Sequence, residues 1–207
     1  MTMPAYTDLT GLGGIALACA ATSLAIPGMQ RLSPARLATL LAVIAVAVLV
    51  PLGPLPLAVC LRGATGDLSI TTLVLLGGAI RRGLLGWPPP ERHGRFALLG
   101  GIAGAALGLY PMALGVGLLD PYRSGYGSPW LVGGLLVVAL AAWFGRLPVI
   151  ATCLALATLG WTLRWYESTN LWDYLLDPLV GLYALGAVAS RGARRLLGSF
   201  RGEPAGA

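Results

Sequence analysis

Long apolar stretches, separated by short polar breaks, follow one another along almost the whole chain of 207 residues. A bilayer crossing needs about 20 apolar residues, because a helix rises ~1.5 Å per residue and the hydrocarbon core is ~30 Å thick. By this measure the pattern predicts seven membrane-spanning helices, and the expected fold class is an all-α, polytopic membrane helix bundle. The expected spans are 10–29, 37–61, 63–80, 96–119, 130–145, 147–163 and 171–190.

Two of these spans depart from a regular apolar helix. The second contains Pro51, Pro54 and Pro56, which would kink a helix or break it into a helix and a re-entrant piece. The apolar run after Asp67 has only thirteen residues, about 20 Å of helix. To cross, the third span must begin near Arg62 and hold Asp67 inside it. If both segments are instead re-entrant, the number of crossings falls to five.

The arginines lie mainly in alternate loops. Eleven of the fourteen follow the first, third, fifth and seventh spans, and only Arg62, Arg123 and Arg164 lie on the opposite side. Loops rich in basic residues stay in the cytoplasm, so the pattern predicts an outer N-terminus and a cytoplasmic C-terminus. Six of the eight acidic residues then fall on the outer side. They are Asp8, Asp67, Asp120, Glu167, Asp173 and Asp177.

The composition agrees with a membrane protein, because 57% of the residues are hydrophobic and only 11% are charged. No soluble domain of useful size fits between the apolar runs. We therefore expect one transmembrane domain, 1–190, and a basic cytoplasmic tail, 191–207, that ends in a disordered segment, RGEPAGA. The net charge of +6 is interpreted as membrane topology, so no nucleic acid is expected as a partner. The expected location is the inner membrane of a cell.

Several cofactor chemistries are excluded by residue types. All fourteen basic residues are arginine, so no lysine can form a Schiff base with retinal or pyridoxal phosphate. His93 is the only histidine, and Cys19, Cys60 and Cys153 have no metal-binding spacing. Neither a metal site nor a cofactor is therefore predicted.

The segment RWYESTNLWDYLLDP, near the last predicted helix, holds three acidic residues and four aromatics in fifteen positions. Asn170 is a suitable N-cap for a helix that begins at Leu171, and it places Asp173 at the third position, where the helix dipole favours an acid. Asp177 then lies one turn further on the same face, below the membrane surface. A helix that begins at Pro178 would make Asp177 an ordinary cap, but would leave only about 20 Å of apolar helix.

Each outer loop thus combines an arginine with an acid, and the three loops are expected to share one surface. Asp67 and Asp177 are the strongest functional candidates, because carboxylates at membrane depth are rare. For the exposed Asp120, Arg123 and Glu167, an ordinary role as turn residues or solvated ion pairs is favoured over a functional one. The tryptophans at this level fit an interfacial belt better than a stacking site. The predicted ligand-binding residues are Arg62, Asp67, Asp120, Arg123, Arg164, Glu167, Asp173 and Asp177.

Three hypotheses for function remain at this point. The first is the binding or transport of a small polar, cationic or lipid-headgroup ligand through an outward-facing pocket of acids and arginines. The second is a membrane-embedded enzyme acting on a lipid-linked substrate, although no nucleophile with an adjacent base is recognisable. The third is an assembly subunit that docks a membrane-protein partner or a second copy of the chain. All three place the protein in contact with the lipid bilayer.

Overall fold

The computed structural model describes residues 5–51, 53–89 and 92–200, and over these residues the chain is all-α, with no β-strand. The helices are α1 Ala5–Ser23, α2 Pro34–Ala47, α3 Leu57–Thr65, α4 Ile70–Leu85, α5 Arg92–Ala113, α6 Pro129–Phe144, α7 Pro148–Thr162, α8 Leu171–Leu175 and α9 Pro178–Phe200. Two 3₁₀ turns, η1 Met29–Arg31 and η2 Pro121–Gly125, complete the list.

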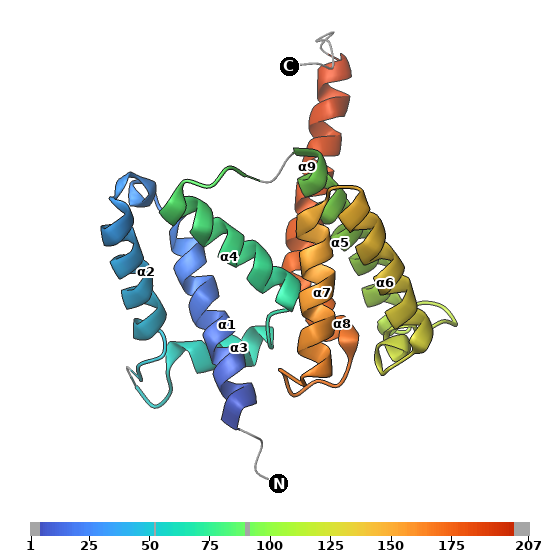
Figure 1. The fold of residues 1–207 in the computed structure, drawn as a ribbon, viewed down its shortest axis with the longest axis horizontal. Coiled ribbons are helices and arrows are strands. Elements are labelled where there is room, and N and C mark those ends of the chain that lie inside the picture. The colour runs from blue at the N-terminus through green and yellow to red at the C-terminus, as the bar shows by residue number, and fades with distance from the viewer. Residues whose placement is uncertain (1–4, 52, 90–91, 201–207) are drawn as a thin grey trace.

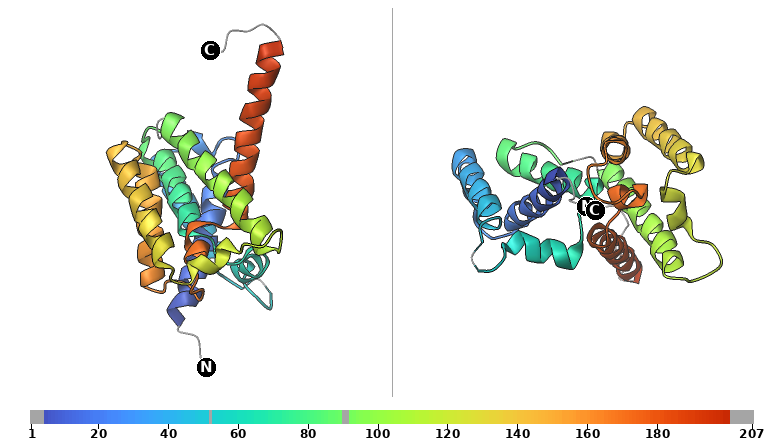
Figure 2. Two further views of the ribbon diagram at one scale, coloured as in Figure 1. Left: turned by 90° about the vertical axis from the view of Figure 1, so that its right-hand side faces the viewer. Right: turned by 90° about the horizontal axis from the view of Figure 1, so that it is seen from below.

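The longer helices run alternately between two ends of the molecule (Figure 1). Helices α1, α2 and α4 form one side, and α5, α6, α7 and α9 form the other. The short helix α3 lies across the direction of α1, as the view from below also shows (Figure 2). The lower end in Figure 1 gathers the start of α1, helix α3, η2, the turn after α7 and α8. The segments that carry the predicted outer acids therefore share one end of the molecule, which we call the acidic end.

Helix starts follow local sequence signals. Proline occupies the first turn of α2, α6 and α7, where its fixed φ suits the helix and its missing N–H is no loss. Ser69 caps α4 by accepting a hydrogen bond from the Thr72 backbone at 3.2 Å. Gly86 ends α4 with φ 64°, a left-handed conformation that glycine adopts without strain.

The second and third predicted spans differ from the structure. Helix α2 ends at Ala47, and the proline segment forms a turn in which Pro51 bridges Pro56. The chain then makes α3, whose nine residues span only about 13 Å. The prolines therefore break the helix and do not merely kink it. Helix α4 begins at Ile70, so the expectation that Asp67 lies inside a helix is wrong.

The start of the last helix also differs from the prediction. Asn170 caps α8 as expected, since its side chain accepts a hydrogen bond from the Trp172 backbone at 2.9 Å. Helix α8 ends after only five residues, and a new helix, α9, begins at Pro178. Asp177 is thus the residue before a proline that starts a helix, and the preferred single helix from Leu171 is wrong. Helix α9 has 23 residues because it continues past Arg191, but its apolar part, 178–190, is only about 20 Å long, as expected for this start.

The main core lies where α5 crosses α9 and where α4, α7 and α8 meet them. Small residues bring α5 and α9 together, because a Cβ added to Gly181 would lie 3.3 Å from the Cβ of Ala106. The glycines of α5 contribute nothing to this contact, since an added Cβ at Gly104 or Gly108 meets no atom within 4 Å. Alanine therefore provides the close packing that the small-residue pattern predicts for this helix.

One described helix, over His93–Ala113 in α5, is both long and apolar enough to cross a bilayer by itself. Helices α2, α6 and α7 are apolar but have only 14, 16 and 15 residues. Membrane character is thus indicated by α5, and the seven crossings are not established. The predicted domain boundary at 190 falls inside α9, and the expected disordered end, 201–207, lies outside the described residues.

Candidate functional site

Arg62 gathers three carboxylates at the acidic end of the molecule. From the last turn of α3 its Nε donates to Asp67 Oδ1 at 2.7 Å, and its Nη1 donates to Asp8 Oδ1 at 2.8 Å. Glu167, on the turn after α7, lies 3.5 Å from Nη2. The hydrogen bond to Asp67 raises the pKa of the Arg62 guanidinium above its ordinary value. One guanidinium therefore ties together three chain segments, with two negative charges in excess.

Gly11 in α1 makes room for this ion pair. A Cβ at this position would lie 2.3 Å from Asp67 Oδ1 and 2.5 Å from Arg62 Nε. No side chain fits at such distances, so the ion pair requires glycine on the facing turn of α1. The close approach of Gly11 to the ion pair fixes α1 against the connection between α3 and α4.

Asp177 joins the starts of two helices. Its Oδ1 accepts from the Val180 backbone at 2.9 Å, in the first turn of α9. Its Oδ2 accepts from the Ser69 backbone at 2.9 Å, from the Ser69 hydroxyl at 2.7 Å and from the Thr72 hydroxyl, at the start of α4. The residue is only 3% exposed. The carboxylate thus satisfies backbone N–H groups and receives the favourable dipole of two helices.

Asp173 in α8 is held by hydroxyl groups. The Tyr122 hydroxyl lies 2.8 Å and 3.0 Å from the two carboxylate oxygens, and Ser168 donates to one of them. Burial, together with the hydrogen bond to Asp173, raises the pKa of Tyr122 above its ordinary value, so the phenol stays a donor. Among the described residues, neither Asp173 nor Asp177 has a cationic partner within 4 Å.

These carboxylates line one cavity of about 360 Å³, which we call the acid cavity. Asp67, Asp173 and Asp177 contribute the charge, and no arginine from the described part of the chain lines it. Its aromatic lining residues are Tyr110, Tyr122, Tyr166 and Trp172. The predicted juxtaposition of Asp67 with Asp177 is therefore found, although neither residue lies within a helix.

Tyr110 adds an open hydrogen-bonding group to the acid cavity. Its hydroxyl is shielded from water and, among the described residues, has no hydrogen-bond partner. Buried hydroxyls are nearly always paired, because an unpaired one costs free energy. The hydroxyl of Tyr166, by contrast, donates to the Leu68 carbonyl at 2.8 Å. Tyr110 is thus the lining residue most in need of a ligand or an enclosed water.

Three of the predicted binding residues lie outside this arrangement. Asp120 caps η2 by accepting from the Tyr122 backbone at 3.1 Å, and Arg123 is exposed on the same turn. Arg164 is exposed after α7 with φ 52°. None of the three lines the acid cavity or takes part in an ion pair among the described residues. The two arginines therefore do not pair with the acids beside them in sequence.

We expect Arg164→Gly to stabilise the protein. Arg164 adopts a left-handed conformation in the turn that ends α7, where Trp165 donates to the Gly160 carbonyl at 2.9 Å. A side chain in this conformation costs about 1 kcal/mol relative to glycine. Thermal unfolding of purified protein should therefore shift upward with no loss of any activity. A lower unfolding temperature would show that the Arg164 side chain makes a stabilising contact.

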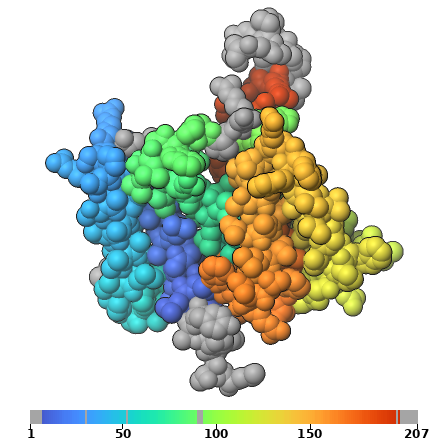
Figure 3. All heavy atoms as spheres, viewed as in Figure 1, coloured from blue at the N-terminus to red at the C-terminus, as the bar shows by residue number. Residues whose placement is uncertain are grey.

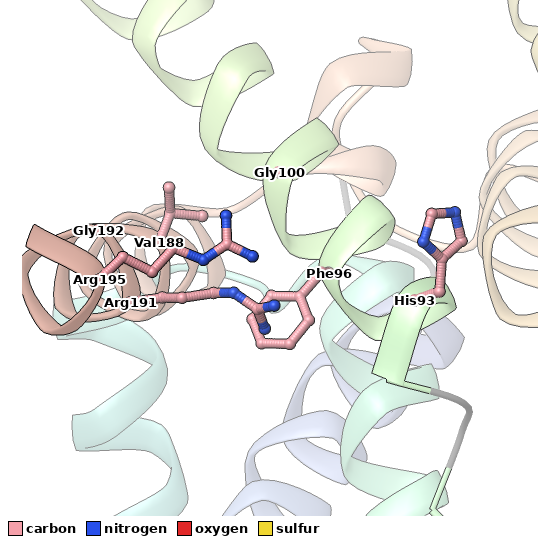
Figure 4. A pocket seen from close by; sticks show the side chains of 7 residues that line it. All are labelled: His93, Phe96, Gly100, Val188, Arg191, Gly192 and Arg195. Atoms are coloured by element: carbon pink, nitrogen blue, oxygen red, sulfur yellow. The ribbon is translucent and has the colours of Figure 1, made fainter. Parts of the chain in front are cut away.

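Two further cavities lie toward the other end. One, of about 570 Å³, lies between the first turns of α5 and the middle of α9. Figure 4 shows Arg191 stacked over Phe96, with its guanidinium carbon 3.4 Å from the ring centroid, and Arg195 beside it. His93 points away from both arginines in this view. The other is an apolar groove of about 480 Å³ between α4, α5 and α9.

Most of the partners that build the acid cavity were not predicted from the sequence. Ser69 and Thr72 precede an apolar run and give an N-cap signal, but nothing in the sequence ties them to an aspartate 105 to 108 positions later. Tyr110 and Tyr122 lie in or next to a predicted span and carry no motif. Among the described residues, no three His, Cys, Asp or Glu side chains are grouped to hold a metal ion. Neither a known protein family, nor a curated protein, nor a solved structure matches this chain.

Proposed function

We propose that this chain is a multi-pass membrane protein that binds a small organic cation in the acid cavity. The observation that carries the proposal is that two lining carboxylates, Asp173 and Asp177, have hydroxyl and N–H donors but no cationic partner among the described residues. Asp67 shares its charge with Arg62 outside the cavity. The lining is therefore acidic overall, and a positively charged ligand would balance it.

Aromatic side chains favour an organic cation over a metal ion. An ammonium group is attracted to the faces of tyrosine and tryptophan within about 6 Å, and quaternary ammonium ligands are commonly bound by such residues. The acid cavity provides Tyr110, Tyr122, Tyr166 and Trp172. The unpaired Tyr110 hydroxyl would serve a hydroxyl or carbonyl group of the same ligand. The volume of about 360 Å³ suits a molecule of the size of an amino alcohol.

Surface composition supports the membrane part of the proposal. Helix α6 lies along an outer edge of the molecule (Figure 3), and Trp130, Val137, Trp143 and Phe144 on it are 65–89% exposed. Apolar patches of this kind mark contact with lipid or protein. We propose that α1, α2, α4, α5, α6, α7 and α9 cross the bilayer, the short ones in a locally thinned membrane. The positive-inside pattern would then place the acidic end outside the cell's inner membrane.

Binding is the activity that the geometry supports directly. Transport through the protein would also require an opening on the inner side of the acid cavity. Asp177 closes this side through its bonds to Ser69 and Thr72. A ligand that replaced these donors at Asp177 would separate the starts of α4 and α9. Transport is thus an extension of the same proposal, and its structural requirement is the release of this carboxylate.

The test of the proposal is the binding of choline to purified protein. We expect saturable binding to the wild type by calorimetry, and Asp173→Asn should weaken it about tenfold, because a charge-assisted contact contributes about 1.5 kcal/mol. Asp120→Asn is the matched control, since it removes an acid from the same end but outside the cavity. Tyr110→Phe should also weaken binding, through loss of the open hydroxyl.

Three outcomes would contradict the proposal. One is choline binding that is equally strong in the wild type and in Asp173→Asn. Another is equal weakening by Asp120→Asn, which would indicate general attraction of cations to the acidic end. A folded wild type that binds neither choline nor tetramethylammonium would also reject it.

A further inference from the structure

The apolar groove noted above lies on the other side of the Asp177 contact. Helix α4 forms one wall with Leu75, Leu76 and Ala79, and Leu98 and Leu99 of α5 face them. In Figure 1, α4 and α7 diverge toward the upper end, and the groove lies between the two sides of the molecule at this point. From Thr72 to Arg82 the α4 wall covers eleven residues, about 15 Å of helix. The walls are thus mostly apolar along this length.

Two arginines also line this groove. Arg82 bends back along α4, since its Nη1 lies 3.5 Å from the position of a Cβ added to Gly78. Arg95 of α5 reaches the hydroxyl of Tyr183 at 3.2 Å. Among the described residues neither arginine has a carboxylate partner. Guanidinium groups beside apolar walls favour a bound anion, because charge in such surroundings is costly without a counter-charge.

We propose that this groove binds an anionic phospholipid. One acyl chain would lie along Leu75, Leu76 and Ala79, and the phosphate would receive hydrogen bonds from Arg82 and Arg95. Charge and shape both fit this ligand: the walls are apolar over about 15 Å, and the cationic groups are two forked donors suited to phosphate. A free phosphate ion would leave the apolar walls empty. A zwitterionic lipid also has a phosphate but brings its own cation, so the charge of the two arginines would stay unbalanced.

This site is separate from the acid cavity. The groove residue Thr72 donates its hydroxyl to Asp177, so this contact forms the partition between the two. The ligands are opposite in charge, and the proposed lipid site does not depend on cation binding. Either proposal can therefore fail while the other stands.

The test is lipid binding by native mass spectrometry of protein purified in a neutral detergent. Phosphatidylglycerol and phosphatidylcholine with identical acyl chains are added in equal amounts. We expect the wild type to retain phosphatidylglycerol about tenfold more often, and the double variant Arg82→Gln/Arg95→Gln to lose this preference. Arg81→Gln is the matched control, because Arg81 stacks on Trp87 at 3.8 Å and does not line the groove.

A second variant tests the apolar part of the site. Ala79→Phe adds a ring to the groove wall, so we expect it to reduce the retention of both lipids. The lipid that still binds should show the same headgroup preference as in the wild type. Inorganic phosphate at millimolar concentration should not displace the lipid. The proposal is overturned if the double variant keeps the wild-type preference, if Arg81→Gln loses it to the same extent, or if Ala79→Phe binds both lipids as the wild type does. Should the double variant not fold, the Ala79→Phe and Arg81→Gln results decide.

Discussion

Asp177→Ala is expected to destabilise the protein by about 4 kcal/mol, because it leaves several buried donors at two helix starts without an acceptor. The donors are the backbone N–H groups of Ser69 and Val180 and the hydroxyls of Ser69 and Thr72. A loss of this size is a large part of the stability of a typical domain. The measurement is the thermal unfolding temperature of purified protein in detergent, together with the yield of folded protein.

Asp177→Asn separates the role of the side-chain oxygens from the role of the charge. The amide keeps one acceptor oxygen but places an NH₂ donor against N–H or hydroxyl groups. We therefore expect Asp177→Asn to destabilise the protein about half as much as Asp177→Ala does. Asp120→Asn, at the exposed turn η2, is the control and should change stability by less than about 0.5 kcal/mol. Unchanged unfolding of Asp177→Ala would show that this carboxylate does not hold α4 to α9.

Gly125→Ala is expected to have the next largest effect, about 3 kcal/mol, because the added methyl group enters the space of a buried side chain. The new Cβ would lie 1.7 Å from Asn170 Oδ1 and 2.7 Å from the Trp172 ring. Asn170 would have to move, which breaks the cap of α8 and its bond to the Tyr122 carbonyl at 3.0 Å. Because Trp172 and Tyr122 line the acid cavity, choline binding should be lost as well.

Gly133→Ala is the matched substitution for this experiment. Gly133 lies within α6, and a Cβ there meets no atom within 4 Å, so alanine should leave stability unchanged or raise it slightly through helix propensity. If Gly125→Ala unfolds at the same temperature as Gly133→Ala, then η2 is not packed against α8 as described.

The length of the apolar runs predicted the helices best where polar residues are few. The expected spans 130–145 and 147–163 agree closely with α6 and α7, because a continuous apolar run that begins with a proline leaves few alternatives. The prediction failed where polar contacts hold a residue in a turn. Asp67 was placed inside a helix to complete a crossing, but its ion pair with Arg62 holds it in the turn between α3 and α4. The sequence indicates this pair, but the length needed for a crossing was given more weight.

Asp177 shows the same limit more clearly. Its sequence position fits both a helix interior and an N-cap, and the choice between them was made on the length of the following helix. The deciding interactions come from Ser69 and Thr72, more than 100 residues away, and no local pattern encodes them. The acids of the cavity and its end of the molecule were expected from the sequence, but the arginines expected beside them, Arg62 and Arg164, do not line it. Its aromatic lining was not predicted, because tyrosine and tryptophan at a span end fit a membrane belt better than a stacking site.

The most direct test of the central claim is a crystal structure of the protein with bound arsenocholine, in which the arsenic atom is located by its anomalous scattering. We expect one arsenic position inside the acid cavity, within about 6 Å of the Trp172 or Tyr122 ring and next to the Asp173 carboxylate. An arsenic position at the outer ion cluster of Arg62 and Asp8, or an empty acid cavity at saturating ligand, would contradict it.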